Sequence, residues 1–554
     1  MTAPPAPSAG PRSATGRTPE ARSQAYGAIG SGFRIVSIAT LLSRILGLAR
    51  DVAMAALFGA GPLMDAFTVA FRVPNLVRRL LGEGALTAAF LPVFVREHER
   101  EGPDGANRLM TAGTLALGGT LLALVLFTEL ILAGLGLTLP LGDEGGLLIL
   151  LTAQMLPYAV LICVAAHFSA VLQSLGRFAW PALLPIILNV VWIAAIAAVP
   201  GFIVDSAVRI QWVAASVVFA GMCQLAVIWI AMRGAGVRFT RDWQPATPMV
   251  GEVVRAMIPV ILATSVTQLN SLVDSLLAWG LAAPPAGTAS VGFAWPLESG
   301  TASALYFAQR MYQFPLGVFG AALGTVLLPL LSRHTERGEL EQVGRDLTLG
   351  IKLTMAIGLP ASVGLILLRE PIAATLFERG AFTGDDSALT ARCIAAYGLG
   401  VCPSIGLLII HRGFFVLGDR RTPVKFALQA VGLNVVCNLS LLWVFAGAGL
   451  ALATSIAAMF QFVATAAAYQ RATRRLNLSD IARATTRTAI ATALMGIACA
   501  AVLAGMPHAV TLAGRLGTLL APLAAATGTY LLTARLIGLN EPFLLLRRDP
   551  ADSP

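Results

Sequence analysis

Charged side chains are scarce in this chain, where Asp, Glu, Lys and Arg make up only 12% of 554 residues. Soluble domains average about 25%. Together with 56% hydrophobic residues and a mean hydropathy of +0.77, this scarcity excludes a soluble enzyme. The apolar stretches are roughly twenty residues long, enough to cross a bilayer as helices, whereas the strands of a membrane barrel would be about ten residues long. The sequence therefore predicts an all-α polytopic membrane protein.

Residues that would form disulfides or metal centres are also few. The six cysteines fall in apolar segments without a CxxC spacing, and the five histidines are scattered without an HExxH motif. We interpret the cysteines as small buried hydrophobic residues. The net charge of +10 comes from arginines dispersed between the apolar stretches, which is a topological charge bias and predicts no nucleic-acid partner.

The N-terminal segment has too few large apolar residues to form a hydrophobic core, and it lacks the apolar centre of a signal peptide. Residues 1–33 are rich in Pro, Ala, Ser, Gly and Arg, a composition that predicts a disordered cytoplasmic tail. Residues 541–554 are expected to form a second cytoplasmic tail.

Apolar runs predict fourteen transmembrane spans. The loops that would be cytoplasmic with the N-terminus inside are rich in arginine, and most of the opposite loops contain neither Lys nor Arg, so both termini are expected inside. The exception is the stretch after the ninth span, where Arg369, Arg379 and Arg392 lie outside among acidic residues. The predicted spans are 35–57, 63–94, 111–137, 147–173, 179–199, 210–232, 249–280, 301–331, 346–368, 389–417, 423–446, 449–470, 487–506 and 514–538.

The chain also contains an internal repeat. Ala85–Pro92 at the end of span two aligns without gaps to Ala322–Pro329 at the end of span eight, and Leu188–Val191 matches Leu433–Val436. Because the matched segments are six spans apart, both copies have the same orientation in the membrane. We expect an N-lobe (34–240, spans one to six) and a C-lobe (241–475, spans seven to twelve) related by a pseudo-two-fold axis. Spans thirteen and fourteen, within 476–540, belong to neither copy.

The first two spans carry eight charged residues where a membrane helix is normally apolar. Each charge at the bilayer centre costs about 2.5–3.5 kcal/mol on insertion scales, so the five arginines among them require a polar interior, and their excess suggests an anionic cargo that carries phosphate. Acids and bases share helix faces, so some of them are expected to neutralise each other. The alternative for Arg78, Arg79 and Glu83 is that they lie near the cytoplasmic end of the span, where their side chains reach the membrane–water interface. The eight are Arg44, Arg50, Asp51, Asp65, Arg72, Arg78, Arg79 and Glu83.

Two further charged residues stand in the second lobe. Arg310 in span eight lies at a depth similar to that of the first-lobe arginines, and a guanidinium group can donate two parallel hydrogen bonds to a phosphate. A cavity lined by arginines from both lobes could therefore bind a pyrophosphate. Asp274 in span seven could pair with Arg310 or bind a coupling cation, and a purely structural ion pair is the alternative.

Several motifs resemble those of the MurJ/MviN lipid II flippases, in the multidrug/oligosaccharidyl-lipid/polysaccharide exporter superfamily. They include Ser43-Arg-Ile-Leu-Gly-Leu-Ala-Arg-Asp51, Pro74-Asn-Leu-Val-Arg-Arg79 and the glycine-rich run Gln313–Pro329. The resemblance implies two lobes with a final helix pair that forms a groove for the polyprenyl chain. It implies substrate-binding charges at Arg44, Arg50, Asp65, Arg78 and Arg310, with Arg79, Glu83 and Gln313 as secondary candidates. Gln313 stands where many relatives have an acid.

The resemblance further implies a transporter of the bacterial cytoplasmic membrane, not an enzyme. Its cargo would be lipid II, the undecaprenyl-pyrophosphate-linked muropeptide, carried to the outer leaflet by alternating access for peptidoglycan synthesis. Membrane lipids and cell-wall synthesis or division proteins are the expected partners. No cofactor is expected. The driving force would be Na+ bound at Asp274 or the membrane potential, although polar partners for Asp274 near span eleven are not evident, since Phe415, Val431 and Val435 occupy that neighbourhood.

Three other functions are compatible with a polytopic fold. A sibling exporter would move another polyprenyl-linked glycan or a drug, and a drug exporter would be expected to have acidic and aromatic cavity residues. A membrane glycosyltransferase generally has acids in a substantial early external loop, whereas the first external loop here is only 58–63 and carries none. A scaffold protein would not explain arginines inside helices.

Overall fold

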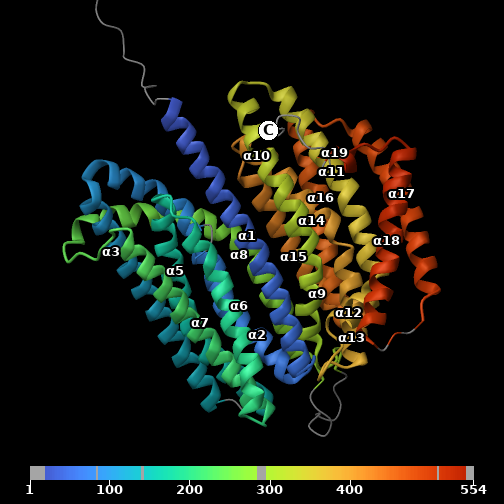
Figure 1. The fold of residues 1–554 in the computed structure, drawn as a ribbon, viewed down its shortest axis with the longest axis horizontal. Helices are drawn as coiled ribbons and strands as arrows, with labels where there is room; N and C mark the ends of the chain where they lie inside the picture. The colour runs from blue at the N-terminus through green and yellow to red at the C-terminus, as the bar shows by residue number, and fades with distance from the viewer. Residues whose placement is uncertain are drawn as a thin grey trace, which may run out of the picture.

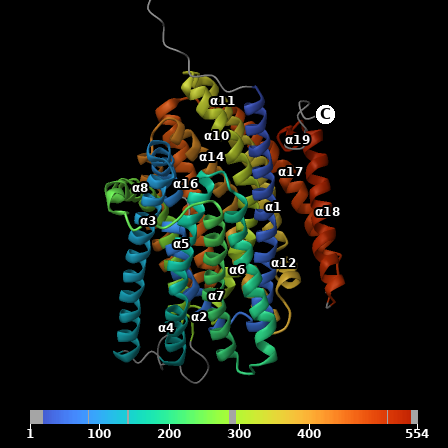
Figure 2. The ribbon, with the colours of Figure 1, turned by 60° about the vertical axis from the view of Figure 1, so that its left-hand side comes forward.

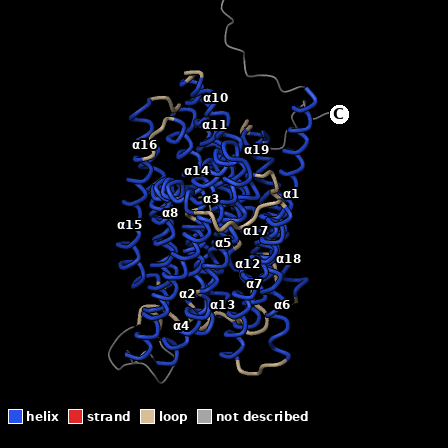
Figure 3. Tube along the Cα trace, turned by 90° about the vertical axis from the view of Figure 1, so that its left-hand side faces the viewer, coloured by secondary structure: helices blue, strands red, loops and turns tan. Residues whose placement is uncertain are grey.

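A computed structural model describes residues 19–82, 85–138, 142–283, 295–507, 509 and 511–544. Within these ranges the chain is helical, and the β-structure is an isolated bridge between Ala282 and Leu297. The helices run mostly side by side along one direction, as a membrane bundle requires (Figures 1 and 2). The tube view shows many of the short loops at the two ends of the bundle (Figure 3). The predicted all-α membrane architecture is confirmed.

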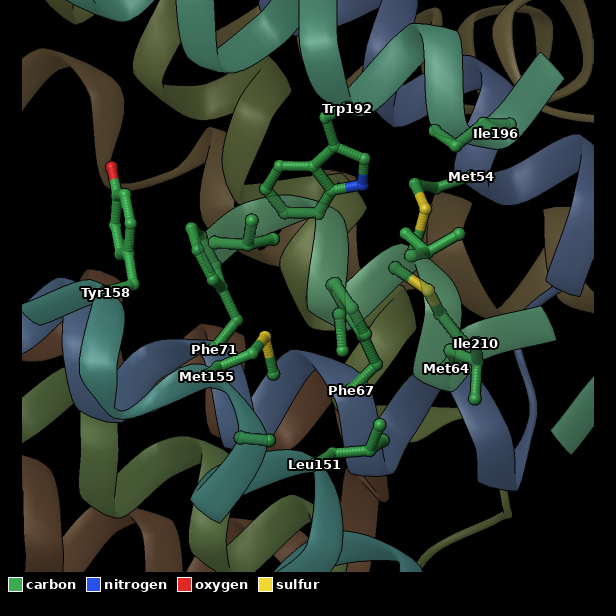
Figure 4. Close-up of a cluster of buried hydrophobic side chains, with 14 of the residues drawn as sticks. Met54, Met64, Phe67, Phe71, Leu151, Met155, Tyr158, Trp192, Ile196 and Ile210 are labelled. Carbon is green, nitrogen blue, oxygen red and sulfur yellow. The ribbon is translucent and has the colours of Figure 1, made fainter. Parts of the chain in front are cut away.

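The N-terminal half packs around a buried apolar cluster. Trp192 packs against both Phe67 and Phe71, with ring centroids 5.5 and 5.0 Å away, and methionines lie beside them (Figure 4). Close-packed rings of this kind hold the helices in fixed positions. The elements of this half are α1 (Pro19–Phe58), α2 (Pro62–Val77), the π-helix η1 (Arg78–Gly82), α3 (Ala85–Thr138, kinked at Gly102), α4 (Gly142–Met155), α5 (Pro157–Ser174), α6 (Ala179–Ala198) and α7 (Ser206–Gly234).

The C-terminal half follows a similar order of elements. Its first helix, α8, contacts α2 and α3 of the preceding half as well as α9 and α15. The elements are α8 (Thr247–Gly280), α9 (Thr301–Pro315), the π-helix η4 (Leu316–Gly320), α10 (Ala321–Glu336), α11 (Leu340–Leu367), α12 (Arg369–Leu376), α13 (Gly384–Gly398), α14 (Val401–Val416), α15 (Arg421–Phe445), α16 (Gly447–Thr473), α17 (Leu478–Ala504), α18 (Leu512–Leu536) and α19 (Glu541–Leu544).

The fourteen predicted spans fall largely on helices, but fewer stretches are apolar enough to be recognised as membrane-spanning by length and composition. Of the described residues, eleven such stretches qualify. One of them joins predicted spans two and three, while α1 and the α9–α10 segment do not qualify. These two helical segments carry Arg44, Arg50, Asp51 and Arg310, and these charged side chains lower the mean hydropathy of the segments. The count of fourteen remains a prediction.

The first helix extends into the predicted N-terminal tail. α1 begins at Pro19, within the segment 1–33 for which the composition predicts a disordered tail. Proline is favoured at the first helical position, and the following Glu20, Ala21, Arg22 and Gln24 are good helix formers. Residues 1–18 lie outside the described range.

The two halves share a structural repeat. Each contains a helix, then a five-residue π-helix, then another helix: α2–η1–α3 and α9–η4–α10. Gly176 after α5 and Gly418 after α14 are also equivalent, with φ values of +74° and +78°. The sequence repeat therefore corresponds to two similarly built lobes, and π-helical turns are often found at functional sites.

The last two long helices pack on the second lobe. α17 and α18 contact each other, and α11 and α12 lie beneath them. Arg515 on α18 forms an ion pair of 2.7 Å with Glu378 after α12, and Lys352 on α11 forms one of 3.0 Å with Glu541 on α19. The pair is thus attached to the second lobe at both ends of the bundle.

At the end predicted to be external, the lobes meet through backbone contacts made by glycines. The Ala381 amide donates to the Ala56 carbonyl at 2.8 Å. A Cβ on Gly59 would lie 2.6 Å from the Ala381 oxygen, and one on Gly380 would lie 3.1 Å from the Ala56 carbonyl carbon. Both glycines have positive φ (+68° and +60°). This close approach of two chains requires residues without side chains.

We predict that Gly380→Ala loosens this external contact. The added methyl would collide with Ala56, and positive φ costs an L-residue about 1–2 kcal/mol. A cysteine placed at Phe58 in a cysteine-free background should then react roughly tenfold faster with a membrane-impermeant thiol reagent. Gly384→Ala is the matched control, because a Cβ there meets nothing within 4 Å. Equal labelling rates in both variants would contradict the prediction.

Candidate functional site

An ion network joins the two lobes at Asp51. The Asp51 side chain is 2% exposed and lies between arginines from different lobes. Its Oδ1 accepts from Arg50 Nη2 at 2.7 Å, and its Oδ2 lies 2.8 Å from Arg310 Nε. The Tyr306 hydroxyl donates to Asp51 Oδ1 at 2.9 Å and accepts from Arg310 Nη2, also at 2.9 Å. α1 and α9 are thereby connected through one buried carboxylate.

Arg50 is enclosed on every side by the first lobe and Tyr306. Its guanidinium group donates to Asn189 Oδ1 on α6 at 3.0 Å and lies 4.3 Å from the ring centroid of Trp192. Asn189 is held in turn by a hydrogen bond from its amide to the Ser43 carbonyl. With this many partners and a side chain only 6% exposed, Arg50 is a buried member of the network.

Arg310 is more accessible, and a second arginine lies at the equivalent position of the first lobe. The Arg310 side chain is 32% exposed. Arg72 on α2 and Arg310 on α9 each stand six residues before a π-helix, which starts at Arg78 and at Leu316 respectively. Arg72 is half-buried and donates to Gln309 on α9 at 3.4 Å. The two lobes therefore contribute repeat-related arginines to the same region.

The other predicted arginines lie around this region. Arg44 is exposed on α1, and its guanidinium group lies against η4 of the second lobe, where a Cβ on Gly317 would be 2.7 Å from Nη2. Arg78 donates from Nε and Nη2 to Asn75 Oδ1, at 3.2 and 2.9 Å. Arg79 donates to Gln268 on α8 at 3.2 Å. Arg44 and Arg79 thus make contacts between the lobes.

Asp65 is placed apart from the arginines. Both of its carboxylate oxygens accept hydrogen bonds at the first turn of α9: from the Gly300 amide at 2.8 Å, the Ser303 amide at 2.7 Å and the Ser303 hydroxyl at 2.6 Å. A carboxylate is stabilising there because the first amides of a helix lack intrahelical partners. In this conformation Asp65 is an interlobe helix cap next to the external contact.

Gln313 and Glu83 complete the predicted set. Gln313 is half-buried on α9, about one turn beyond Arg310. Glu83 lies outside the described residues.

Asp274 on α8 is buried within a second polar cluster. Asn438 on α15 donates to its Oδ1 at 2.6 Å, and the Thr454 hydroxyl on α16 donates to its Oδ2 at 3.1 Å. Asn434, fully buried one turn from Asn438, accepts from the Asn438 amide at 2.8 Å. The sequence interpretation was wrong in finding no polar partners here, because it considered Val431 and Val435 on neighbouring faces of the same helix. The alternative pairing of Asp274 with Arg310 is also wrong, since Arg310 pairs with Asp51.

The repeat relates these two polar clusters. Asn189 and Asn434 are the matched asparagines of Leu188–Val191 and Leu433–Val436. In the first lobe the asparagine contacts Arg50 on the lobe's first helix, and in the second it joins the cluster around Asp274 on that lobe's first helix. The repeated asparagine therefore lies beside the cation Arg50 in the first lobe and within the cluster around the anion Asp274 in the second.

Sequence reasoning missed the residues that hold the arginines in place. Asp51 and Arg72 were noted among the eight charged residues of the first two spans, but neither was included in the predicted binding set. Tyr306 and Asn189 were not singled out, because a tyrosine and an asparagine in apolar helices are common. The repeat carried a usable signal, since it aligned Asn189 with Asn434 and placed Arg72 opposite Gln309, next to Arg310. The π-helices of the structure then bring Arg72 and Arg310 to equivalent positions.

Two pseudo-symmetric lobes of membrane helices around a cationic interlobe site define a transporter of the alternating-access type. A family model described as "Lipid II flippase MurJ" matches residues 54–520. The "Probable lipid II flippase MurJ" of Rhizobium tropici is 34% identical over 470 residues, covering 84% of this chain and 85% of the relative. That of Vibrio cholerae is 33% identical, covering 76% and 79%.

Solved structures show the same fold. The structure entitled "Lipid II flippase MurJ, inward closed conformation" aligns with a TM-score of 0.73 at 22% identity, covering 92% of this chain and 99% of that one. An inward-facing multidrug resistance MATE family transporter of the MOP superfamily aligns with a TM-score of 0.60 at 14% identity, covering 82% and 99%. The chain belongs to the lipid II flippase MurJ family, whose members are transporters and not enzymes.

We predict that Asp51→Asn strongly destabilises the protein. Losing one partner of a buried ion pair leaves uncompensated charge and costs about 3–5 kcal/mol, and here two arginines lose their shared carboxylate. Thermal unfolding of the purified protein in one detergent should show a clearly lower midpoint for Asp51→Asn. Asp104→Asn, at an exposed acidic residue, serves as the control. Unchanged midpoints in both variants would mean that Asp51 does not hold the lobes together.

Proposed function

We propose that this chain moves lipid II from the inner to the outer leaflet of the bacterial cytoplasmic membrane for peptidoglycan synthesis. Family membership and the names of its relatives support this function. The observation that carries it is the buried Asp51 carboxylate held between Arg50 and Arg310 of opposite lobes. An interior that already binds one anion between guanidinium groups is suited to a pyrophosphate.

The accessible arginines are the ones that meet the cargo. Arg310 is partly exposed, and Arg72 lies at the equivalent place in the other lobe, with Arg44 at the interlobe surface. Guanidinium groups bind phosphate with two parallel hydrogen bonds, which fixes its orientation. The pyrophosphate competes with Asp51 for Arg310, while Arg50 stays enclosed and keeps Asp51 in position.

This competition couples binding to conformational change. Separating the lobes without cargo would part Arg310 from Asp51 and leave buried charges without partners, at a cost of several kcal/mol. A bound pyrophosphate supplies the replacement anion, so the loaded protein opens more readily than the empty one. Opening on the external side also requires Asp65 to leave the first turn of α9 and the glycine contact around Ala56 to separate.

A drug exporter of the same superfamily is the alternative, because MATE transporters share the fold. The abundance of arginine at the interlobe region favours an anionic cargo over the cationic compounds that acidic cavities bind. Another polyprenyl-pyrophosphate-linked glycan would satisfy the same chemistry, and a binding assay with defined lipids separates these cargoes.

We predict that Arg310→Gln and Arg72→Gln each weaken binding of purified protein to lipid II by about tenfold or more. Each removes a charge-assisted hydrogen bond worth about 1.5–3 kcal/mol. Neither variant should replace an essential lipid II flippase in cells, although both should reach the membrane. Arg345→Gln changes an exposed arginine on α11 and should behave as the unmodified protein. Full complementation by both site variants would refute the arginine site.

We also propose that Na+ binds at Asp274 and contributes to the driving force, with the membrane potential as the other source. The cluster offers oxygen atoms from Asp274, Asn434, Asn438 and Thr454, the donor type that hard cations prefer. Asn438 Oδ1 is buried and has no hydrogen-bond partner among the described residues, so a cation could use it. A bound cation would neutralise Asp274 and draw α8, α15 and α16 together.

The sodium proposal predicts that Na+ raises the unfolding temperature of the protein and that the shift grows with concentration. K+ at equal ionic strength should give a smaller shift, and Asp274→Asn should abolish the difference between the two ions. Asp143→Asn, at an exposed acid of α4, is the control. A Na+ shift that persists in Asp274→Asn would place the cation elsewhere.

We propose that both termini face the cytoplasm. Two of the three external arginines that weaken the charge rule form local ion pairs, Arg369–Glu370 at 3.2 Å and Arg392–Glu298 at 3.4 Å. The arginines of the loops at the other end of the bundle outnumber these three, which supports this orientation. Cell-wall synthesis and division proteins are the partners that the cargo would bring into contact with the transporter.

A further inference from the structure

A polar pocket of about 290 Å³ lies between α11, α17 and the α18–α19 connection, at the end of the bundle proposed to be cytoplasmic. Figure 2 shows α19 at the same end as the start of α11, on the outer edge of the bundle. The ionisable lining consists of three cations and two carboxylates, so its net charge is +1. These residues are Lys352, Arg483, Arg487, Asp480 and Glu541.

Both carboxylates of this pocket form ion pairs with the lysine. Lys352 lies 3.0 Å from Glu541 and 3.5 Å from Asp480. Arg483 is only loosely paired, 3.7 Å from Asp480 with its side chain 66% exposed, and Arg487 donates one hydrogen bond, to the Gly538 carbonyl at 3.3 Å. A guanidinium group has five N–H donors. Both arginines therefore retain donors for an anion that enters the pocket.

The same face of α17 continues as an apolar stripe. Beyond Arg483 and Arg487, positions 490, 494 and 497 follow at helical spacings of three and four residues, so all five side chains share one face. Ile490, Leu494 and Ile497 are 49%, 45% and 66% exposed. From Arg487 to Ile497 the helix rises about 15 Å, which is half of the roughly 30 Å hydrocarbon core. The stripe therefore matches one leaflet.

We propose that this pocket binds the head group of an anionic glycerophospholipid from the cytoplasmic leaflet. The phosphate lies between Arg483 and Arg487, and an acyl chain follows Ile490, Leu494 and Ile497. A soluble anion would leave the apolar stripe unused. The site is separate from the arginine cluster at Asp51, because α17 packs on α11 and α18 at the edge of the bundle. Basic pockets between membrane helices on the cytoplasmic side bind anionic head groups in this way.

The test is native mass spectrometry of the full-length protein in detergent, titrated with phosphatidylglycerol, phosphatidylcholine or undecaprenyl phosphate. The unmodified protein should bind phosphatidylglycerol about tenfold or more tightly than phosphatidylcholine, because each basic residue near the head group contributes about fivefold. The double variant Arg483→Gln/Arg487→Gln should lose this preference. Arg483→Lys/Arg487→Lys keeps the charge and should retain most of it.

A matched pair of exposed arginines outside the pocket provides the control, Arg238→Gln/Arg420→Gln, which has the same loss of charge. It should bind phosphatidylglycerol as the unmodified protein does. Equal loss in both double variants would show a general charge effect and overturn the site. Preferential binding of undecaprenyl phosphate at these arginines would overturn the phospholipid assignment. Lipid binding is measured without transport, so failure of this inference leaves the proposed cargo untouched.

Discussion

A single buried carboxylate between two guanidinium groups constrains the whole structure. Asp51 belongs to one lobe, and Arg310 belongs to the other, so their ion pair fixes how the lobes sit against each other at this depth. A charge in a membrane interior must be compensated, and Asp51 interacts with two arginines at once, which leaves the three residues with a net charge of +1. The Tyr306 hydroxyl adds contacts to Asp51 and Arg310, and Asn189 together with Trp192 completes the surroundings of Arg50.

The repeat shows how one framework acquired two electrostatic roles. Asn189 and Asn434 occupy equivalent positions, and an amide side chain can both donate and accept. It therefore supports Arg50 in the first lobe and the cluster around Asp274 in the second. Arg72 and Arg310 keep the same charge in both lobes instead. A pseudo-symmetric scaffold can thus present matched cations to a cargo and still reserve an acidic site for one lobe only.

Much of the fold, and less of the site, was predictable from the sequence. Hydropathy indicated most of the helices because each span must cross a membrane of fixed thickness. Arg50 and Arg310 were found because a charged residue inside a span is costly and is therefore expected to have a function. Helical periodicity assigns a face but not a partner, so it could not show that Asp51 would bridge to Arg310, more than two hundred residues away. It could not show that Asp65 caps α9 either, because backbone amides at a helix start leave no mark in the sequence. Asn438 and Thr454 were missed for the same reason, since their common partner Asp274 lies on another helix.

The two interlobe contacts differ in kind, and the difference suits alternating access. At the external end the lobes meet through glycine backbone contacts, a hydrogen bond from Ala381 to Ala56 and the Asp65 cap. Groups of this type can exchange their partners for water when they separate, so their net cost is small. The Asp51 contact lies deeper, where water is not a ready substitute, and only another anion can replace the carboxylate at low cost. Under the proposed function, full separation of the lobes therefore requires the deep ion network to break, whereas the surface contacts can loosen locally. In the proposed function, such a protein remains closed when empty and opens when an anionic cargo occupies Arg310.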